Sequence, residues 1–201
     1  MTGSDTEPAL TSDAIASLFT RPDGTFLCAR WGRPVAPVVF GLDDATLAVF
    51  RSALRAAFTH ARQPLVETDP EMGANLMVFA VRDWGELNGL PDLERLTGML
   101  DLPQRLADEG DGQGADRYRL FRFDPDGSIR AALVFLRLGP AADRTHPAAL
   151  AEEVAVNALL TWAHPVRASG ALAGLIRAAY DPLLPACARD PSHALRLAAR
   201  L

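Results

Sequence analysis

Residues 118–138, YRLFRFDPDGSIRAALVFLRL, decide the fold of this 201-residue chain. Two runs rich in β-forming residues, 118–123 and 128–138, flank the tetrapeptide Asp124-Pro125-Asp126-Gly127. Proline at the first corner of a turn and glycine at a left-handed position favour a tight reversal of the chain. The stretch therefore predicts an antiparallel β-hairpin, with Gly127 at a positive φ.

The segments before this hairpin predict a small sheet with one helix packed on it. The nearly continuous apolar run 75–82 is typical of a central strand that is covered on both faces. Runs 25–31 and 35–40 read as a pair of strands, and Pro37 places the second of them at an edge or a bulge. After the second of these strands, Asp43 or Asp44 caps a long helix. The buried stripe of this helix is Leu47, Phe50, Leu54, Ala57, Phe58 and Ala61, and its other face carries Arg51, Arg55 and Arg62.

The remaining segments predict short helices. Ser12 caps the first helix, and residues 84–107 form one or two helices whose inward residues are Leu87, Leu90, Leu93, Leu96 and Leu100. The acidic, glycine-rich stretch 108–116 predicts a loop, and helices are expected over 148–163, 171–180 and 192–200. We interpret residues 1–11 as a disordered lead and 12–201 as a single α+β domain, a small mixed sheet packed against helices.

Composition excludes several functional classes. The chain is 49% apolar and 22% charged with a net charge of −5, which fits a globular domain. All 20 basic residues are Arg, so Schiff-base chemistry and a P-loop lysine are excluded. The acidic balance argues against nucleic acid as a partner, and no apolar run is long enough to span a membrane. We therefore keep two partner hypotheses, another protein or a second copy of the chain.

The N-terminus has neither a basic segment nor an apolar run, so we expect no secretory signal and a cytoplasmic location. Cys28 and Cys187 lie far apart in the sequence and fit no metal-binding spacing. A cytoplasmic location favours two reduced thiols, and a disulfide is the alternative.

Several short motifs carry a resemblance. They are Arg30-Trp31 followed by Pro34, the strand 74–78, Val134-Phe135-Leu136, the helix start Glu152-Glu153-Val154, and Ala179-Tyr180-Asp181-Pro182. With these motifs, residues from about 25 to 186 resemble a bacterial family of uncharacterised proteins that is itself similar to a degenerate metzincin-type zinc peptidase. The resemblance implies a zincin-like outline, and many of the relatives are exported, in contrast to the cytoplasmic expectation.

The zinc ligands of such a peptidase are not matched by this sequence. A working zincin carries His-Glu-x-x-His on a helix, where the two imidazoles bind zinc and the Glu activates water. When Glu153 is aligned with that Glu, Glu152 and Val156 occupy the two histidine positions and Trp162 occupies the third ligand position. Val and Trp cannot ligate zinc, so the resemblance implies a domain without metal, and we expect no cofactor.

A relocated carboxylate site is the alternative that would make the chain a hydrolase-type enzyme. Its candidate catalytic residues are Glu152, Glu153 and Tyr180, because paired carboxylates can share a proton and shift each other's pKa. In the structural interpretation, the two Glu residues stabilise the positive end of a helix. We then expect Glu153 to be partly buried and hydrogen-bonded to backbone or to an Arg.

Arg30, Trp31 and Arg33 form the one cluster whose composition resembles a binding surface, because Trp and Arg are enriched at interface hot spots. The alternative is an Arg that packs along a core Trp. Our leading hypothesis is a non-catalytic, zincin-like binding or assembly domain. A structural subunit that self-associates through an alanine-rich helical face is a further alternative.

We predict that the purified protein carries no stoichiometric zinc, because Val156 and Trp162 stand where imidazoles would be needed. Chelation should also leave its melting temperature unchanged, since a core of this size does not depend on metal. Elemental analysis tests the first statement, and thermal unfolding with and without EDTA tests the second. About one zinc per chain retained through mild chelation would contradict them.

Overall fold

The computed structural model describes residues 10–113, 116–139 and 146–201, so most of the expected disordered lead lies outside the described residues. The architecture is mixed α+β, as predicted. A four-stranded sheet has the order β2 (Pro37–Phe40), β3 (Leu76–Val81), β5 (Ile129–Arg137) and β4 (Arg117–Phe123). The first three strands are parallel, and β4 is antiparallel to β5. Pro37 lies on an edge strand, and 75–82 supplies the central strand, as the sequence indicated.

The β4–β5 hairpin is confirmed. Gly127 has a φ of +84°, and its N–H donates to the Asp124 carbonyl over 2.8 Å. A Cβ atom at this position would lie 2.7 Å from Cys187 Sγ, so the turn is packed as well as left-handed. Gly127 therefore has two reasons to be glycine.

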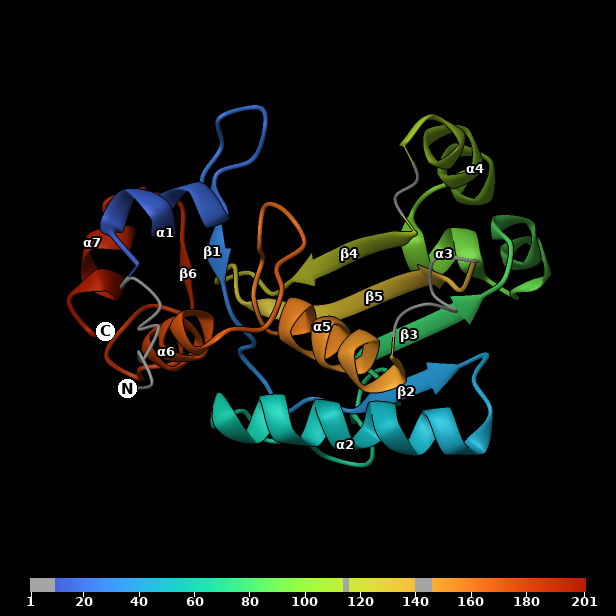
Figure 1. The fold of residues 1–201 in the computed structure, drawn as a ribbon, viewed down its shortest axis with the longest axis horizontal. Helices are drawn as coiled ribbons and strands as arrows, with labels where there is room; N and C mark the ends of the chain where they lie inside the picture. The colour runs from blue at the N-terminus through green and yellow to red at the C-terminus, as the bar shows by residue number, and fades with distance from the viewer. Residues whose placement is uncertain (1–9, 114–115, 140–145) are drawn as a thin grey trace, which may run out of the picture.

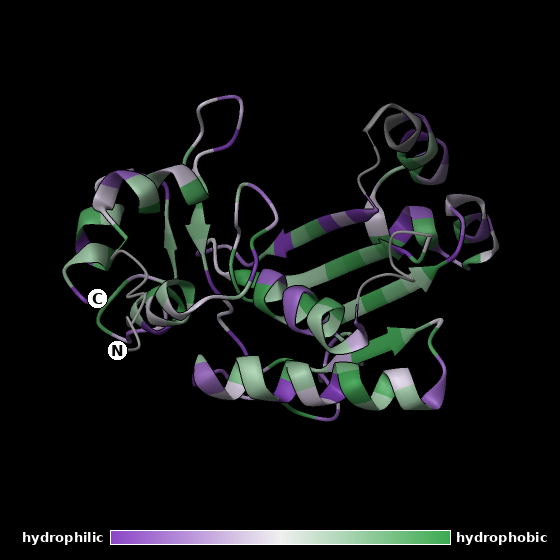
Figure 2. Cartoon of the chain, viewed as in Figure 1, coloured by the Kyte–Doolittle hydropathy of each residue, from purple (hydrophilic) through white to green (hydrophobic). Residues whose placement is uncertain are grey.

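Two helices cover one face of the sheet (Figure 1). They are α2 (Asp44–His60) and α5 (Pro147–Leu159), which pack against each other. Asp43 caps α2 by accepting the N–H groups of Ala45 and Thr46. Phe50, Leu54 and Phe58 are buried against the sheet, as the helical stripe predicted. The hydrophobic colouring of β3 and β5 in Figure 2 agrees with their central position.

The opposite face carries a second apolar cluster. There η1 (Trp84–Gly89), α3 (Leu93–Thr97) and α4 (Leu102–Gln113) pack around Phe79, Leu133 and Phe135 of the sheet. The prediction of Leu100 as an inward residue is wrong: it is 82% exposed, because α3 ends at Gly98 and Leu100 falls in the connection. The expected loop 108–116 is also wrong over most of its length, because α4 continues to Gln113 beyond its apolar residues.

The third part of the molecule joins the two ends of the chain. It contains α1 (Ser12–Phe19), β1 (Cys28–Ala29), α6 (Gly170–Ala179), β6 (Cys187–Ala188) and α7 (His193–Ala198). The strand expected over 25–31 is reduced to the two residues of β1, which pair with β6. The cap of α1 is Thr11 rather than Ser12, and α5 ends before 163 because Leu160 forms a bridge with Arg30.

Both cysteines are free thiols, and the β1–β6 register explains why. Cys28 lies opposite Ala188, and Cys187 lies opposite Ala29. Successive residues of a strand point to opposite faces, so the two thiols lie on opposite faces of this ribbon. The ribbon therefore holds the thiols apart.

We predict that Gly127→Ala destabilises the protein more than Gly24→Ala does. Both glycines have nearly the same φ, +84° and +82°, but a Cβ at Gly24 meets nothing within 4 Å. Gly24→Ala should cost about 1 kcal/mol from the left-handed backbone alone, and Gly127→Ala should cost more because it also meets Cys187. Urea unfolding of the two variants measures the difference. Equal losses would contradict the contact with Cys187.

Candidate binding cleft

Three segments and the last turn of the chain surround a cleft of about 820 Å³. The segments are 30–34 after β1, 60–64 at the end of α2, and 177–182 at the end of α6. Arginines dominate the polar lining, which also includes His60 and Asp181; they are Arg30, Arg33, Arg62, Arg177 and Arg200. A cleft of this size is in the range that binds small molecules or a few residues of a peptide. Its charge is opposite in sign to the net charge of the whole chain.

Segment 30–34 is held by the core. Trp31 is 1% exposed, and its Nε1–H donates to the Ala158 carbonyl over 2.8 Å, so Trp31 is a core residue. The Arg30 guanidinium lies over the Tyr180 ring at 5.7 Å, and its buried Nε has no partner among the described residues. The structure thus brings Arg30, Trp31 and Arg33 to one cleft, together with Tyr180.

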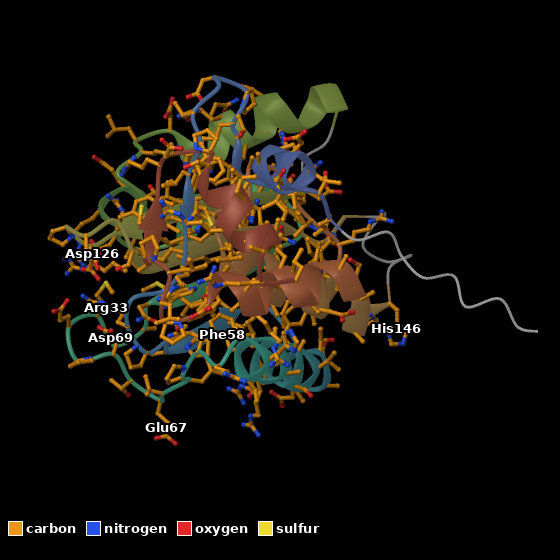
Figure 3. All side chains as sticks on the ribbon, turned by 90° about the vertical axis from the view of Figure 1, so that its left-hand side faces the viewer. Arg33, Phe58, Glu67, Asp69, Asp126 and His146 are labelled. Carbon is orange, nitrogen blue, oxygen red and sulfur yellow. The ribbon has the colours of Figure 1, made fainter. Side chains whose placement is uncertain are left out.

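Arg33 is neutralised by acids on the rim of the cleft. Its Nε and Nη2 atoms donate to the two oxygens of Asp124, at 3.2 and 2.9 Å, and Nη1 donates to Glu71 at 3.0 Å. Asp69 lies 3.9 Å from the same guanidinium, and Figure 3 shows Arg33 and Asp69 together on the side of the molecule away from His146. Hydrogen bonding to Glu71 is the main cause that raises the pKa of Arg33. We therefore assign Arg33 a positioning role in the rim.

A buried amide network fixes this rim. The fully buried Asn75 accepts the Ala36 N–H at 2.7 Å and donates to the Pro34 carbonyl and to Asp69. Gln63 donates to the Arg33 carbonyl at 2.6 Å. The sequence analysis did not identify Asn75 or Gln63 as part of the site. The polar Asn75 at the start of the otherwise apolar run 75–82 was the signal that could have found this network.

Arg62 occupies an unusual backbone position. It follows α2 with a φ of +57°, its N–H donates to the Thr59 carbonyl, and the Gln63 N–H donates to the Phe58 carbonyl. This is the Schellman ending of a helix, in which the left-handed residue is usually glycine. An Arg at this position costs free energy, and strained positions of this kind cluster at functional sites.

The arginines of the cleft differ in their pairing. Arg200 donates to Asp181 at 2.7 Å. The pKa of Asp181 is lowered first by the Leu183 N–H and then by Arg200. Arg62 and Arg177 are exposed, and neither forms an ion pair with any residue in the described part of the chain. The unneutralised positive charge of the cleft therefore comes from Arg30, Arg62 and Arg177.

The candidate catalytic residues do not form one site. Glu153 is partly buried and ion-paired with Arg117 of β4, which confirms the expected contact with an Arg. Glu152 is exposed and lines a separate groove of mostly small apolar residues between α2, α5 and α6. The Tyr180 hydroxyl is buried and donates to the Leu159 carbonyl over 2.7 Å, and burial raises its pKa. No described hydrogen bond or ion pair joins these three side chains.

The positions aligned with zinc ligands are packed into the core. Val156 is 7% exposed, and Trp162 is 4% exposed, stacks on Phe19 and donates to the Val156 carbonyl. Within residues 10–113, 116–139 and 146–201, no three His, Cys, Asp or Glu side chains converge as a metal site would require. None of the helices described here combines the length and apolar character needed to cross a membrane.

Comparisons with protein families, with curated proteins and with solved structures return no match for this chain. The resemblance to a degenerate zinc peptidase therefore stays a prediction from the sequence.

We predict that stability falls at alkaline pH through two buried groups. Burial raises the pKa of Cys28 from 9.0 to about 12, and it raises the pKa of Tyr180 from 10.0. Each group stays neutral in the folded protein at a pH where it ionises in the unfolded chain. Their stabilisation is thus complete below pH 9 and is lost as pH rises, by up to about 1.4 kcal/mol per pH unit for each group.

Urea unfolding as a function of pH checks this prediction. No Lys titrates in this range, and Arg119, whose pKa burial lowers to about 10, acts on stability in the opposite direction in wild type and variants alike. Cys28→Ala should remove the first part of the decline, and Tyr180→Phe should remove the part above the ordinary tyrosine pKa. Cys187→Ala is the comparison variant. Burial also raises the pKa of this half-buried thiol, but by less, so its removal should change the decline less than Cys28→Ala does. Parallel profiles for wild type and Cys28→Ala would show that Cys28 does not contribute.

Proposed function

We propose that this chain is a non-catalytic binding domain whose ligand carries negative charge and occupies the arginine-lined cleft. The zincin-like part of our hypothesis rests on the sequence resemblance alone. The observation that carries the proposal is Arg62, which has a strained left-handed backbone at the rim of the cleft and no acidic partner among the described residues.

The charge pattern supports a carboxylate- or phosphate-bearing ligand. Arg177 faces the same cleft without an ion pair, and Arg30 has a buried Nε–H that lacks an acceptor in the described part of the molecule. Guanidinium groups match the geometry of carboxylate and phosphate, and such charge-assisted hydrogen bonds are about twice as strong as neutral ones. Free arginines beside already paired ones leave the cleft ready for an anion.

The contacts of the Tyr180 and Glu153 side chains support binding over hydrolysis. The Tyr180 hydroxyl is engaged with the Leu159 carbonyl, and Glu153 is engaged with Arg117. Neither group is free to transfer a proton to a molecule in the cleft. The cleft instead offers fixed donors, which recognise charge without a chemical step.

Arg62→Gly tests the proposal because it should separate stability from binding. Glycine relieves the left-handed strain, so the free energy of unfolding should rise by about 0.5 to 1 kcal/mol. Binding of citrate or pyrophosphate, measured by titration calorimetry at constant ionic strength, should weaken about tenfold. Arg177→Gln should weaken binding similarly without raising stability.

Asp92→Gly is the matched control, because Asp92 has nearly the same φ, +58°, and lies outside the cleft. It should leave anion binding unchanged. If wild type binds neither probe, or if Arg62→Gly and Arg177→Gln bind both probes as wild type does, the cleft is not an anion site.

A further inference from the structure

A second hollow joins the arginine cleft. It has a volume of about 920 Å³ and lies between the edge strand β2, the outer side of α2 and segment 63–67. Arg62, Gln63 and Pro64 line both hollows, so the two hollows are adjacent, and together we call them the furrow. The furrow runs from the open edge of the sheet to Arg177.

The helix wall of this furrow carries a line of arginines. Arg51, Arg55 and Arg62 are exposed, and none of them forms an ion pair with a residue that the structure describes. Arg51 and Arg55 are four residues apart and therefore lie on one side of α2, and Arg62 follows the end of this helix. The wall is a row of free positive charges in a chain with a net charge of −5.

The other wall has unpaired main-chain groups. Val35 bonds outward, because its N–H donates to the Pro64 carbonyl and its carbonyl accepts the Val66 N–H. Ala36 bonds inward, to Asn75 and Leu76 of the next strand. In a parallel strand these directions alternate, so the Val39 N–H and C=O point outward. No described residue bonds to them there, because the chain turns away at Asp69–Gly73.

From these two walls we propose that the furrow binds an extended acidic segment of another protein, which pairs with Val39 as an added strand and places its carboxylates on the arginines of α2. Addition of a strand to an exposed sheet edge is a common mode of peptide recognition. The proposal rests on the proposed function, since the same segment ends in the arginine-lined cleft.

The dimensions of the two walls agree. Side chains on one face of an extended strand repeat every 6.8 Å or so, and residues four apart on a helix are separated by about 6 Å along the axis. Acidic residues at alternate positions of the segment therefore match Arg51 and Arg55.

The wall chemistry favours a peptide over a nucleic acid. The outward carbonyls of Pro37 and Val39 need hydrogen-bond donors, which a peptide N–H provides and a phosphodiester does not. An acidic peptide satisfies both the carbonyls and the arginines.

The test uses the full chain and a fluorescent peptide of alternating Glu and Val, about seven residues long. Fluorescence anisotropy should show saturable binding that weakens with salt. Arg51→Gln combined with Arg55→Gln should weaken binding about tenfold or more. Arg21→Gln combined with Arg189→Gln is the matched control, because it removes the same charge from exposed sites outside the furrow and should have no effect.

Main-chain pairing has a separate readout. Hydrogen exchange of the Val39 amide, followed by NMR, should slow about tenfold or more when the peptide is bound. A peptide that is N-methylated on alternate residues keeps its charge but loses donors, so it should neither bind tightly nor protect Val39. Equal binding of both peptides would overturn the strand pairing.

The outcomes distinguish this inference from the proposed function. If citrate or pyrophosphate binds in a manner that depends on Arg177 but the peptide does not bind, the anion cleft stands and the furrow proposal is wrong. If peptide binding depends on Arg177 and Arg62 but not on Arg51 and Arg55, the peptide uses the cleft alone, and the proposal is again wrong. Tighter binding of a single-stranded oligonucleotide than of the peptide would also reject it.

Discussion

The side chain of Asn75 hydrogen-bonds to main-chain groups of segment 34–36 as a neighbouring strand would. It lies where the sheet, the rim of the cleft and the turn at Asp69 meet. Its amide bonds to Ala36, Pro34 and Asp69, and it is fully buried. A buried amide without these partners would cost several kcal/mol, so the three segments are constrained to one arrangement. Arg33 then reaches Asp124 on the hairpin turn, which couples the rim to β4 and β5. The free arginines of the cleft depend on this frame, because it fixes the backbone that faces them.

Local signals in the sequence predicted the parts of the fold that local interactions determine. The hairpin around Gly127, the stripe of α2 and the apolar strand β3 each need only neighbouring residues to be recognised. The pairing of β1 with β6 joins residues about 160 positions apart, and no pattern in either segment identifies the other as its partner. The β-forming residues of run 25–31 therefore predicted a full strand, but only two of them pair with the two residues of β6.

The candidate site was predictable only in part for the same reason. Arg30, Trp31 and Arg33 stood out because they are neighbours in the sequence, and they do line the cleft. Arg177 and Arg200 come from distant segments that only the fold brings together. Arg62 was seen as a solvent-facing residue of a helix, because the sequence carries no glycine there to mark the left-handed ending. Arg62 was therefore the hardest residue of the cleft to identify, because an Arg at this left-handed position opposes the local preference for glycine.

The pairing of β1 with β6 also determines the order in which parts of the fold can form. Thr161 accepts the Ala29 N–H and donates to the Leu27 carbonyl, β1 pairs with β6, and α1 packs on α7. During synthesis from the N-terminus, α1 and β1 emerge long before any of these partners exists. Segments made before their partners are thus completed only when those partners follow, and contacts of such long sequence separation slow folding. Until then the apolar side chains of α1, Ile15 and Phe19 among them, lack the cover that the C-terminal segments provide in the folded protein, and uncovered apolar surface of this kind promotes aggregation.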